Sequence, residues 1–180
     1  MRHKRGVAYL VKTSLTAALA AVLCVASGTA RAGWQGATWN SSPEQANKEF
    51  RLPHRAPDTW WQFERIAFDY ALGDLEFDGA LLFKHNRLTW VDLYLKDPSK
   101  CEKLIEILRR IYGRPAKDEP DDYMWGEPAT IHHSSHELIW YDQENSNEVY
   151  LNQQLYHDHR IEDDCHLHYM PFIIPKPGQL

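Results

Sequence analysis

The clearest pattern along the chain is an alternation of apolar and polar residues that gives way to a helical period. Between Ile66 and Leu72 the alternation has a period of two, which predicts a half-buried strand. Gly73 and Asp74 then suit a two-residue hairpin turn, and pairing across it brings the apolar faces of both strands together. The stretch predicts an antiparallel hairpin with one face in the core.

A third strand is predicted after a reversal at residues 85–87. A two-residue loop would turn Trp90, Asp92 and Tyr94 toward the core, whereas a three-residue loop would turn them away from it. The longer loop is preferred because it keeps the charge of Asp92 out of the core. The residues then expected on the core face are Val91, Leu93 and Leu95, and those expected on the opposite face are Leu82, Leu88, Trp90 and Tyr94.

The period changes to that of a helix after Ser99. Ser99 and Glu102 form a capping-box pattern, and Gly113 and Pro115 mark the end of the segment. Charged residues occupy one side, so an amphipathic helix is predicted. Its expected apolar side consists of Cys101, Leu104, Ile105, Leu108, Ile111 and Tyr112.

The remainder of the chain predicts one short helix and more strands. Ser42, a proline in the first turn and Gln45 are typical of a helix start. Later, an acidic segment containing Pro120 is expected to be a loop, with turns at residues 134–135 and 145–147. The strands expected there are residues 123–125, 130–133, 136–141, 149–156 and 165–170.

Together these elements predict an α+β fold, in which an antiparallel sheet is covered by two helices and held by one disulfide. The two helix starts, Ser42 and Ser99, lie 57 residues apart. This spacing suggests a tandem αβββ duplication. The expected boundaries are a domain over 33–170, possible halves at 33–97 and 98–170, and a proline-rich tail over 171–180.

The N-terminus has the pattern of a secretory signal peptide. A basic start precedes an uncharged apolar run over residues 15–26, and Ala30 and Ala32 supply the small residues that precede a cleavage site. The apolar run is short for a membrane span. Residues 1–32 are therefore expected to be removed, which predicts a periplasmic or secreted protein with no membrane span after cleavage.

Cleavage would make the chain strongly acidic. Residues 1–32 hold five of the 20 Lys and Arg residues and none of the 25 Asp and Glu residues, so the formal net charge would change from −5 to −10. An acidic domain repels nucleic acid and anionic membranes and attracts basic partners. A charge of this size also serves solubility alone.

Two cysteines remain after cleavage, Cys101 and Cys165, and each lies on the apolar face of its predicted element. An even number of cysteines in an oxidising compartment is typical of disulfide-bonded proteins. A disulfide between Cys101 and Cys165 is therefore predicted. The alternative, a catalytic or metal-binding thiol, is rarely needed in an exported chain with one cysteine pair.

Three segments resemble those of a group of small exported bacterial proteins of unassigned function. They are Trp39–Glu44, the strand pair from Phe83 to Leu95, and the helix end Tyr112-Gly113-Arg114-Pro115. The folds of that group are similar to the modules of BamE-like lipoproteins and of proteins of the β-lactamase-inhibitor type. The resemblance implies a role in protein binding or in the cell envelope. It transfers no functional residue, and this chain lacks a lipid-attachment site.

Histidines are the unusual polar feature of the chain. Two pairs, His157/His159 and His166/His168, have the i, i+2 spacing that directs both side chains to one face of a strand. Such pairs on adjacent strands could bind zinc or copper through imidazole nitrogens. Alternating polar residues are also typical of the solvent face of any strand, which needs no metal.

Aromatic residues offer a second candidate site. Trp90 and Tyr94 are expected on the face opposite the core, together with Leu82, and aromatic side chains are enriched where proteins bind partners. Aromatic residues also serve as bulk in a small core.

Motifs of enzymes such as a serine elbow, a Walker loop, a dinucleotide fingerprint or a zincin helix do not occur in the sequence. The function predicted is therefore non-enzymatic: an exported domain that binds a protein partner in the cell envelope, of the inhibitor or immunity type, without a cofactor. One alternative is a histidine-based zinc- or copper-binding protein. A weaker alternative is a cell-wall hydrolase.

Overall fold

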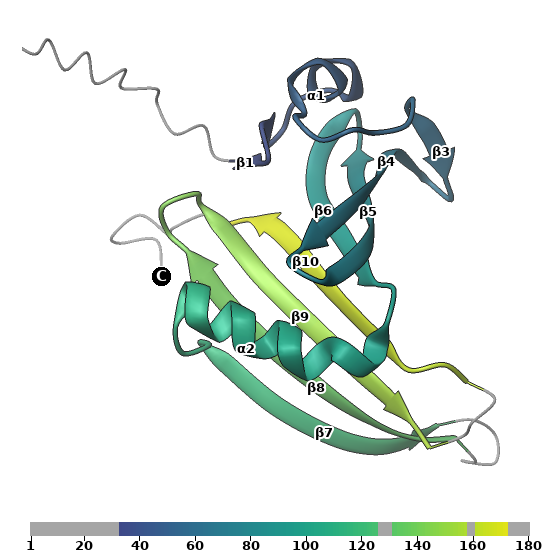
Figure 1. Cartoon of the computed structure of the whole chain (residues 1–180). Coiled ribbons are helices and arrows are strands. Elements are labelled where there is room, and N and C mark those ends of the chain that lie inside the picture. Colours follow the sequence, from purple (N-terminus) through teal and green to yellow (C-terminus); the bar gives the residue numbers. More distant parts are fainter. Residues whose placement is uncertain (1–32, 126–130, 158–160, 173–180) are drawn as a thin grey trace, which may run out of the picture.

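The computed structural model of the protein describes residues 33–125, 131–157 and 161–172, and most of them belong to one antiparallel sheet of eight strands (Figure 1). The strand order is β3-β4-β5-β6-β10-β9-β8-β7, so the two halves of the chain meet where β6 pairs with β10. The strands are β3 (Asp58–Trp60), β4 (Phe63–Leu72), β5 (Leu75–Lys84), β6 (Arg87–Leu95), β7 (Lys117–Trp125), β8 (Ile131–Asp142), β9 (Asn147–Tyr156) and β10 (Asp164–Pro171).

The elements outside the large sheet are short and pack on one of its faces. A small hairpin of β1 (Gly33–Trp34) and β2 (Ala37–Thr38) leads into α1 (Pro43–Glu49), and a 3₁₀ turn (Pro98–Lys100) leads into α2 (Cys101–Tyr112). The core includes residues of α1, of α2 and of the small hairpin, together with one set of alternating sheet residues. This face is called the covered face below.

The predicted α+β fold class is wrong, because the protein is mostly sheet. Of the described residues, 56% lie in strands and 17% in helices. The α-helices have only 7 and 12 residues, so they cover part of a sheet of eight strands. Each half of the chain contributes four strands to this sheet, not the three of the αβββ unit.

Two strands of the second half are longer than predicted, because they run through residues whose sequence is typical of a loop or a turn. β7 runs through the acidic segment and Pro120, where a loop was expected. Proline and charged residues are tolerated at this place because β7 is the edge strand of the sheet. β8 continues through Ser134 and Ser135 without the expected turn, and both serines pair with residues of β7 on one side and of β9 on the other.

The hairpin of β4 and β5 confirms the predicted register, with Ile66 opposite Leu81 and Leu72 opposite Leu75. Its turn is tight because Gly73 adopts a φ of 65°. The next hairpin differs from the prediction: His85 and Asn86 form a two-residue turn in which both have positive φ.

A β-bulge restores the expected faces of β6 despite this shorter turn. The register shifts between Leu82 and Phe83, so that Leu82 pairs with Trp90 and Phe83 pairs with Leu88. Trp90 and Tyr94 therefore point away from the core, as predicted. The prediction that Leu88 lies on the face opposite the core is wrong, because this residue is fully buried on the covered face beside Phe83. The core residues Val91, Leu93 and Leu95 are confirmed.

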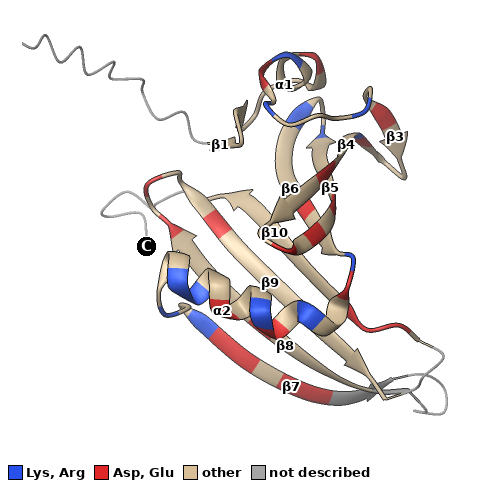
Figure 2. Cartoon of the chain, viewed as in Figure 1, with Lys and Arg blue, Asp and Glu red and all other residues tan. Residues whose placement is uncertain are grey.

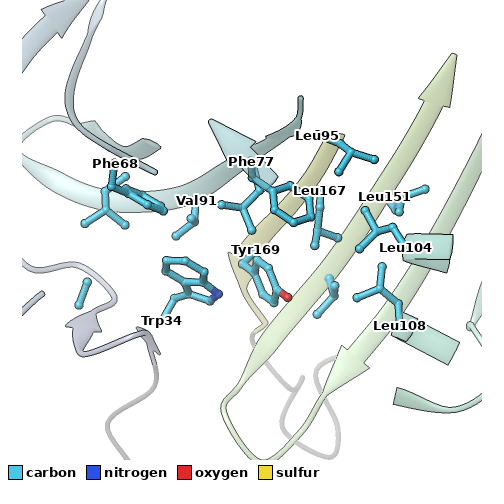
Figure 3. Close-up of a cluster of buried hydrophobic side chains, with 14 of the residues drawn as sticks. Trp34, Phe68, Phe77, Val91, Leu95, Leu104, Leu108, Leu151, Leu167 and Tyr169 are labelled. Carbon is cyan, nitrogen blue, oxygen red and sulfur yellow. The ribbon is translucent and has the colours of Figure 1, made fainter. Parts of the chain in front are cut away.

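One hydrophobic core runs across the covered face from Trp34 to α2 (Figure 3). Its second half is fastened by the predicted disulfide, which joins Cys101 at the start of α2 to Cys165 on β10, with 5.9 Å between the Cα atoms. Both cysteines are buried. Closing a loop of this length is expected to stabilise the fold by about 4 kcal/mol through the entropy of the unfolded chain.

Candidate partner-binding face

The face of the sheet opposite the covered face is called the open face. Its side chains are those that alternate with the core residues along each strand. Among the described residues, neither α-helix packs on it. Its central residues are Ala80 and Leu82 on β5, Trp90, Asp92 and Tyr94 on β6, His166 and His168 on β10, Tyr150 and Asn152 on β9, and Glu137 on β8.

The three residues proposed from sequence as a partner-binding site lie together on the open face. Leu82 pairs directly with Trp90, and Tyr94 follows four residues later on the same strand. Trp90 packs edge-on against Phe63, with 4.8 Å between ring centroids. Leu82 is only 1% exposed, whereas Tyr94 is 40% exposed. The ring of Tyr94 is thus accessible to a partner, whereas Leu82 is buried beside Trp90 and could not itself contact one.

Polar side chains form two cross-strand rows where the halves of the sheet meet. In one row His166 pairs with Tyr94 on β6 and with Asn152 on β9. In the neighbouring row His168 pairs with Asp92 on β6 and with Tyr150 on β9. The His166 ring lies edge-on to that of Tyr94, with centroids 5.2 Å apart, and 4.6 Å from that of His168. The rows place four rings side by side on the surface.

Carboxylates orient both imidazoles. Asp92 contacts Nδ1 of His168, and Oδ2 of Asp164 lies 3.1 Å from Nδ1 of His166. Asp92 is buried although it lies on the open face. Because each Nδ1 lies beside a carboxylate, Nε2 is the ring nitrogen left for an external group.

Oδ1 of Asn152 is buried and has no hydrogen-bond partner among the described residues, whereas Oδ1 of Asp92 and Nδ1 of His166 each lie beside an ion-pair partner. A buried polar atom without a hydrogen bond costs about 1–3 kcal/mol, so a water molecule or a ligand group is expected to bond to Asn152.

A charged network borders the rows on β8. Glu137 accepts hydrogen bonds from Nζ of Lys117 at 2.7 Å and from the hydroxyl of Tyr150 at 2.9 Å. Both hydrogen bonds lower the pKa of the Glu137 carboxyl, and the bond from Lys117 has the larger effect. The Tyr94 hydroxyl has a raised pKa, mainly through burial and then through the charges of Asp92 and Asp164. Tyr94 thus stays neutral at physiological pH.

A hollow of about 390 Å³ lies beside Tyr94 on the first half of the open face. Its lining includes the small side chains of Ala67 and Ala80 and the larger ones of Trp60 and Tyr94. Arg65 also lines it and is fixed by two hydrogen bonds to the carboxylate of Asp58, at 2.7 and 3.1 Å. The hollow has room for a partner side chain between two partly exposed aromatic rings.

Of the histidines suggested as metal ligands, the described ones do not all come together: His166 and His168 are neighbours, and His157 lies apart from them. His157 lies beyond β9, where its Nε2 is 3.2 Å from Oγ of Ser134. His166 pairs with Asn152, five residues back along that strand, which corresponds to about 17 Å. His159 lies outside the described residues, as does the predicted signal peptide. Within the described ranges no group of three or more His, Cys, Asp or Glu residues could hold a metal ion.

The sequence indicates the histidines and aromatic residues of this face, and Asp164 as a carboxylate that could orient a ring, but not Asp92, Tyr150 or Glu137. The contact of Asp92 with His168 follows from the pairing of β10 with β6, and the Tyr150–Glu137 bond follows from the pairing of β9 with β8. A signal was present in β9, where Tyr150 and Asn152 alternate with Val149 and Leu151.

The described part of the chain has no helix that is long and apolar enough to span a membrane. Comparison of the chain with protein-family models, with curated proteins and with solved structures found no match.

Proposed function

We propose that this protein is an exported domain that binds a protein partner through the open face of its sheet. The observation that carries the proposal is the position of Tyr94 and Trp90 on a sheet face that neither α-helix packs on, beside a hollow and above buried polar groups. Binding energy in protein interfaces is concentrated in such central aromatic residues, next to pockets that receive side chains of the partner.

Export is supported by the disulfide, because such bonds form and persist in oxidising compartments. The N-terminal signal pattern agrees with this location, which we take to be the periplasm or the exterior of the cell.

The charge of the chain points to a basic partner. After cleavage the net charge would be −10, and acidic residues occur on β7 at one edge of the sheet and on β4 and β5 in its other half (Figure 2). Complementary charge speeds encounter and selects among partners. A basic envelope enzyme that this protein inhibits, or against which it gives immunity, fits this description.

The proposal is tested by affinity capture from envelope extract, followed by a measured Kd for the partner obtained. The Tyr94→Ala variant is expected to weaken binding by about 2 kcal/mol, or roughly 30-fold. Leu155→Ala is the matched control, because Leu155 is equally exposed at 40% but lies on the opposite side of β9. Equal affinity of wild type and Tyr94→Ala would refute the proposal.

A second candidate function is binding of zinc or copper by His166 and His168. The specific observation in its favour is that a carboxylate faces Nδ1 of each ring, the arrangement that orients metal-binding imidazoles in many proteins. Calorimetric titration with both ions tests it, and an absence of heat would exclude it.

A further inference from the structure

A second concave site lies on the covered face, separate from the open face. It is a cavity of about 780 Å³ between the small hairpin β1–β2 and the C-terminal half of α2. The walls come from the hairpin, α2, the end of β4, the turn before β9, and β10. Cavities of this size accommodate small-molecule ligands.

Backbone and side-chain hydrogen bonds hold the hairpin wall in place. The amide of Arg51 donates to the carbonyl of Gln35 at 3.1 Å, and Nδ2 of Asn147 donates to the carbonyl of Gly33 at 3.3 Å. Gly36 has a φ of 93°, and a Cβ there would lie 2.7 Å from the carbonyl oxygen of Glu49. The hairpin is therefore seated closely on the end of α1, and the cavity exists without a ligand.

Three tyrosines line the inner side of the cavity. The hydroxyls of Tyr112 and Tyr169 are 3.5 Å apart, and Tyr70 interacts electrostatically with both. Trp34 lies beside Tyr169, with 5.8 Å between ring centroids (Figure 3). Burial raises the pKa of all three tyrosines, so their hydroxyls stay neutral and can both donate and accept hydrogen bonds.

The remaining walls combine apolar and polar side chains. Leu72 and Ile111 are apolar, and Ile111 is 57% exposed. Glu49 and Arg51 bring one charge of each sign. The Thr38 hydroxyl donates to Glu49 and the Asn145 amide donates to Asp142, so the side-chain oxygens of Thr38 and Asn145 can still accept from a ligand, whereas Asn147 is bonded to Trp39 and Gly33. An apolar ligand would give these oxygens no donor, and a charged ligand would meet both an attractive and a repulsive side chain.

An uncharged ligand with many hydroxyls and apolar C–H faces satisfies both kinds of wall. We infer that this cavity is a binding site for a short saccharide of one to three rings, held against the rings of Tyr70 and Tyr112 and by hydrogen bonds to the tyrosine hydroxyls and to the side-chain oxygens of Thr38 and Asn145. This activity goes beyond the proposed partner binding and uses the other face of the sheet.

Two trisaccharides serve as probes for the purified protein: N-acetylated chitotriose, which carries N-acetyl groups, and maltotriose, which does not. Isothermal titration calorimetry and saturation-transfer NMR are expected to detect binding of at least one of them at millimolar concentration. Tyr112→Phe removes a hydroxyl but keeps the ring, and is expected to weaken binding about two- to tenfold. Replacing both Tyr70 and Tyr112 by alanine removes the two rings against which the saccharide packs and is expected to abolish binding.

Two controls separate this site from the open face. Tyr141→Phe removes a hydroxyl from an exposed tyrosine outside the cavity, and Tyr94→Ala removes the central ring of the open face. Both are expected to bind the saccharide as the wild type does. The inference is overturned if neither trisaccharide binds the wild type, or if the folded double variant Tyr70→Ala/Tyr112→Ala, checked by circular dichroism, binds as well as the wild type. Loss of partner binding alone would leave it intact.

Discussion

The two faces of the large sheet use the same strands for different purposes. On β10, Cys165 and Leu167 are buried in the core under α2, while His166 and His168, which alternate with them, face the other side. On β6, Leu93 is fully buried and its neighbour Tyr94 is 40% exposed. Stability is thus concentrated on the covered face, and the groups suited to recognition lie on the open face. Substitutions of adjacent residues can separate the two.

The largest expected effect comes from the disulfide on the covered face. Replacing both cysteines (Cys101→Ala with Cys165→Ala) is expected to lower the free energy of unfolding by about 4 kcal/mol, because the unfolded chain regains the entropy of an open loop. Chemical denaturation of the oxidised wild type and the double variant measures this. A loss below about 1 kcal/mol would show that α2 is held mainly by packing.

The neighbours Leu93 and Tyr94 provide the sharpest contrast between the faces. Leu93→Ala creates a cavity in the core and is expected to cost about 3 kcal/mol of stability. Tyr94→Ala removes a partly exposed ring and is expected to cost about 1 kcal/mol or less. Urea unfolding of both variants gives the comparison. Equal losses would mean that the open face contributes to stability as much as the core does.

Gly79 tests how closely the covered face is packed. A Cβ at this position would lie 2.3 Å from the ring of Phe68 on the neighbouring strand. Gly79→Ala is therefore expected to destabilise the protein by about 1–3 kcal/mol, because the ring must move within a packed core. Gly73→Ala, in a turn with open space around it, isolates the effect of backbone strain in the same thermal unfolding experiment.

The smallest expected effect is the pH dependence contributed by Glu137 on the open face. Its pKa is lowered in the folded protein, so its contribution to stability is present above its ordinary pKa of 4.5 and is lost as the pH falls through the folded value. Because the pair with Lys117 is partly exposed, the contribution is expected to be only about 0.5 kcal/mol. Lys117→Met should remove this acid-dependent part in unfolding curves measured between pH 3 and 7. An unchanged pH dependence would contradict the role of the pair.

The sequence was most informative where one local rule governs a segment. The β4–β5 hairpin follows from strict alternation and a glycine turn, and α2 follows from helical spacing and from Gly113 at its end. The predicted capping box is wrong, because Lys100 holds the N-cap position and Ser99 bonds to Asp97. The hairpin and the helix depend on neighbours in the sequence, and the disulfide needed only the number of cysteines and their positions on apolar faces, so these features could be predicted.

The features that could not be predicted depend on contacts between distant segments. β7 carries Pro120 and many carboxylates, and only its place at the edge of the sheet makes such a strand possible. The bulge beside Phe83 changes the turn length without changing the core residues of β6. The pairing of β10 with β6 brings His168 to Asp92, which lies 76 positions earlier in the sequence.

The most direct test of the partner-binding proposal places a photoreactive benzoylphenylalanine at Tyr94 on the open face, or at Leu155 on the other side of the sheet, in cells that export the protein. Illumination is expected to attach a partner protein to the position of Tyr94 and to leave that of Leu155 without it. Attachment of the same protein from Leu155, with none from Tyr94, would contradict the assignment of recognition to the open face.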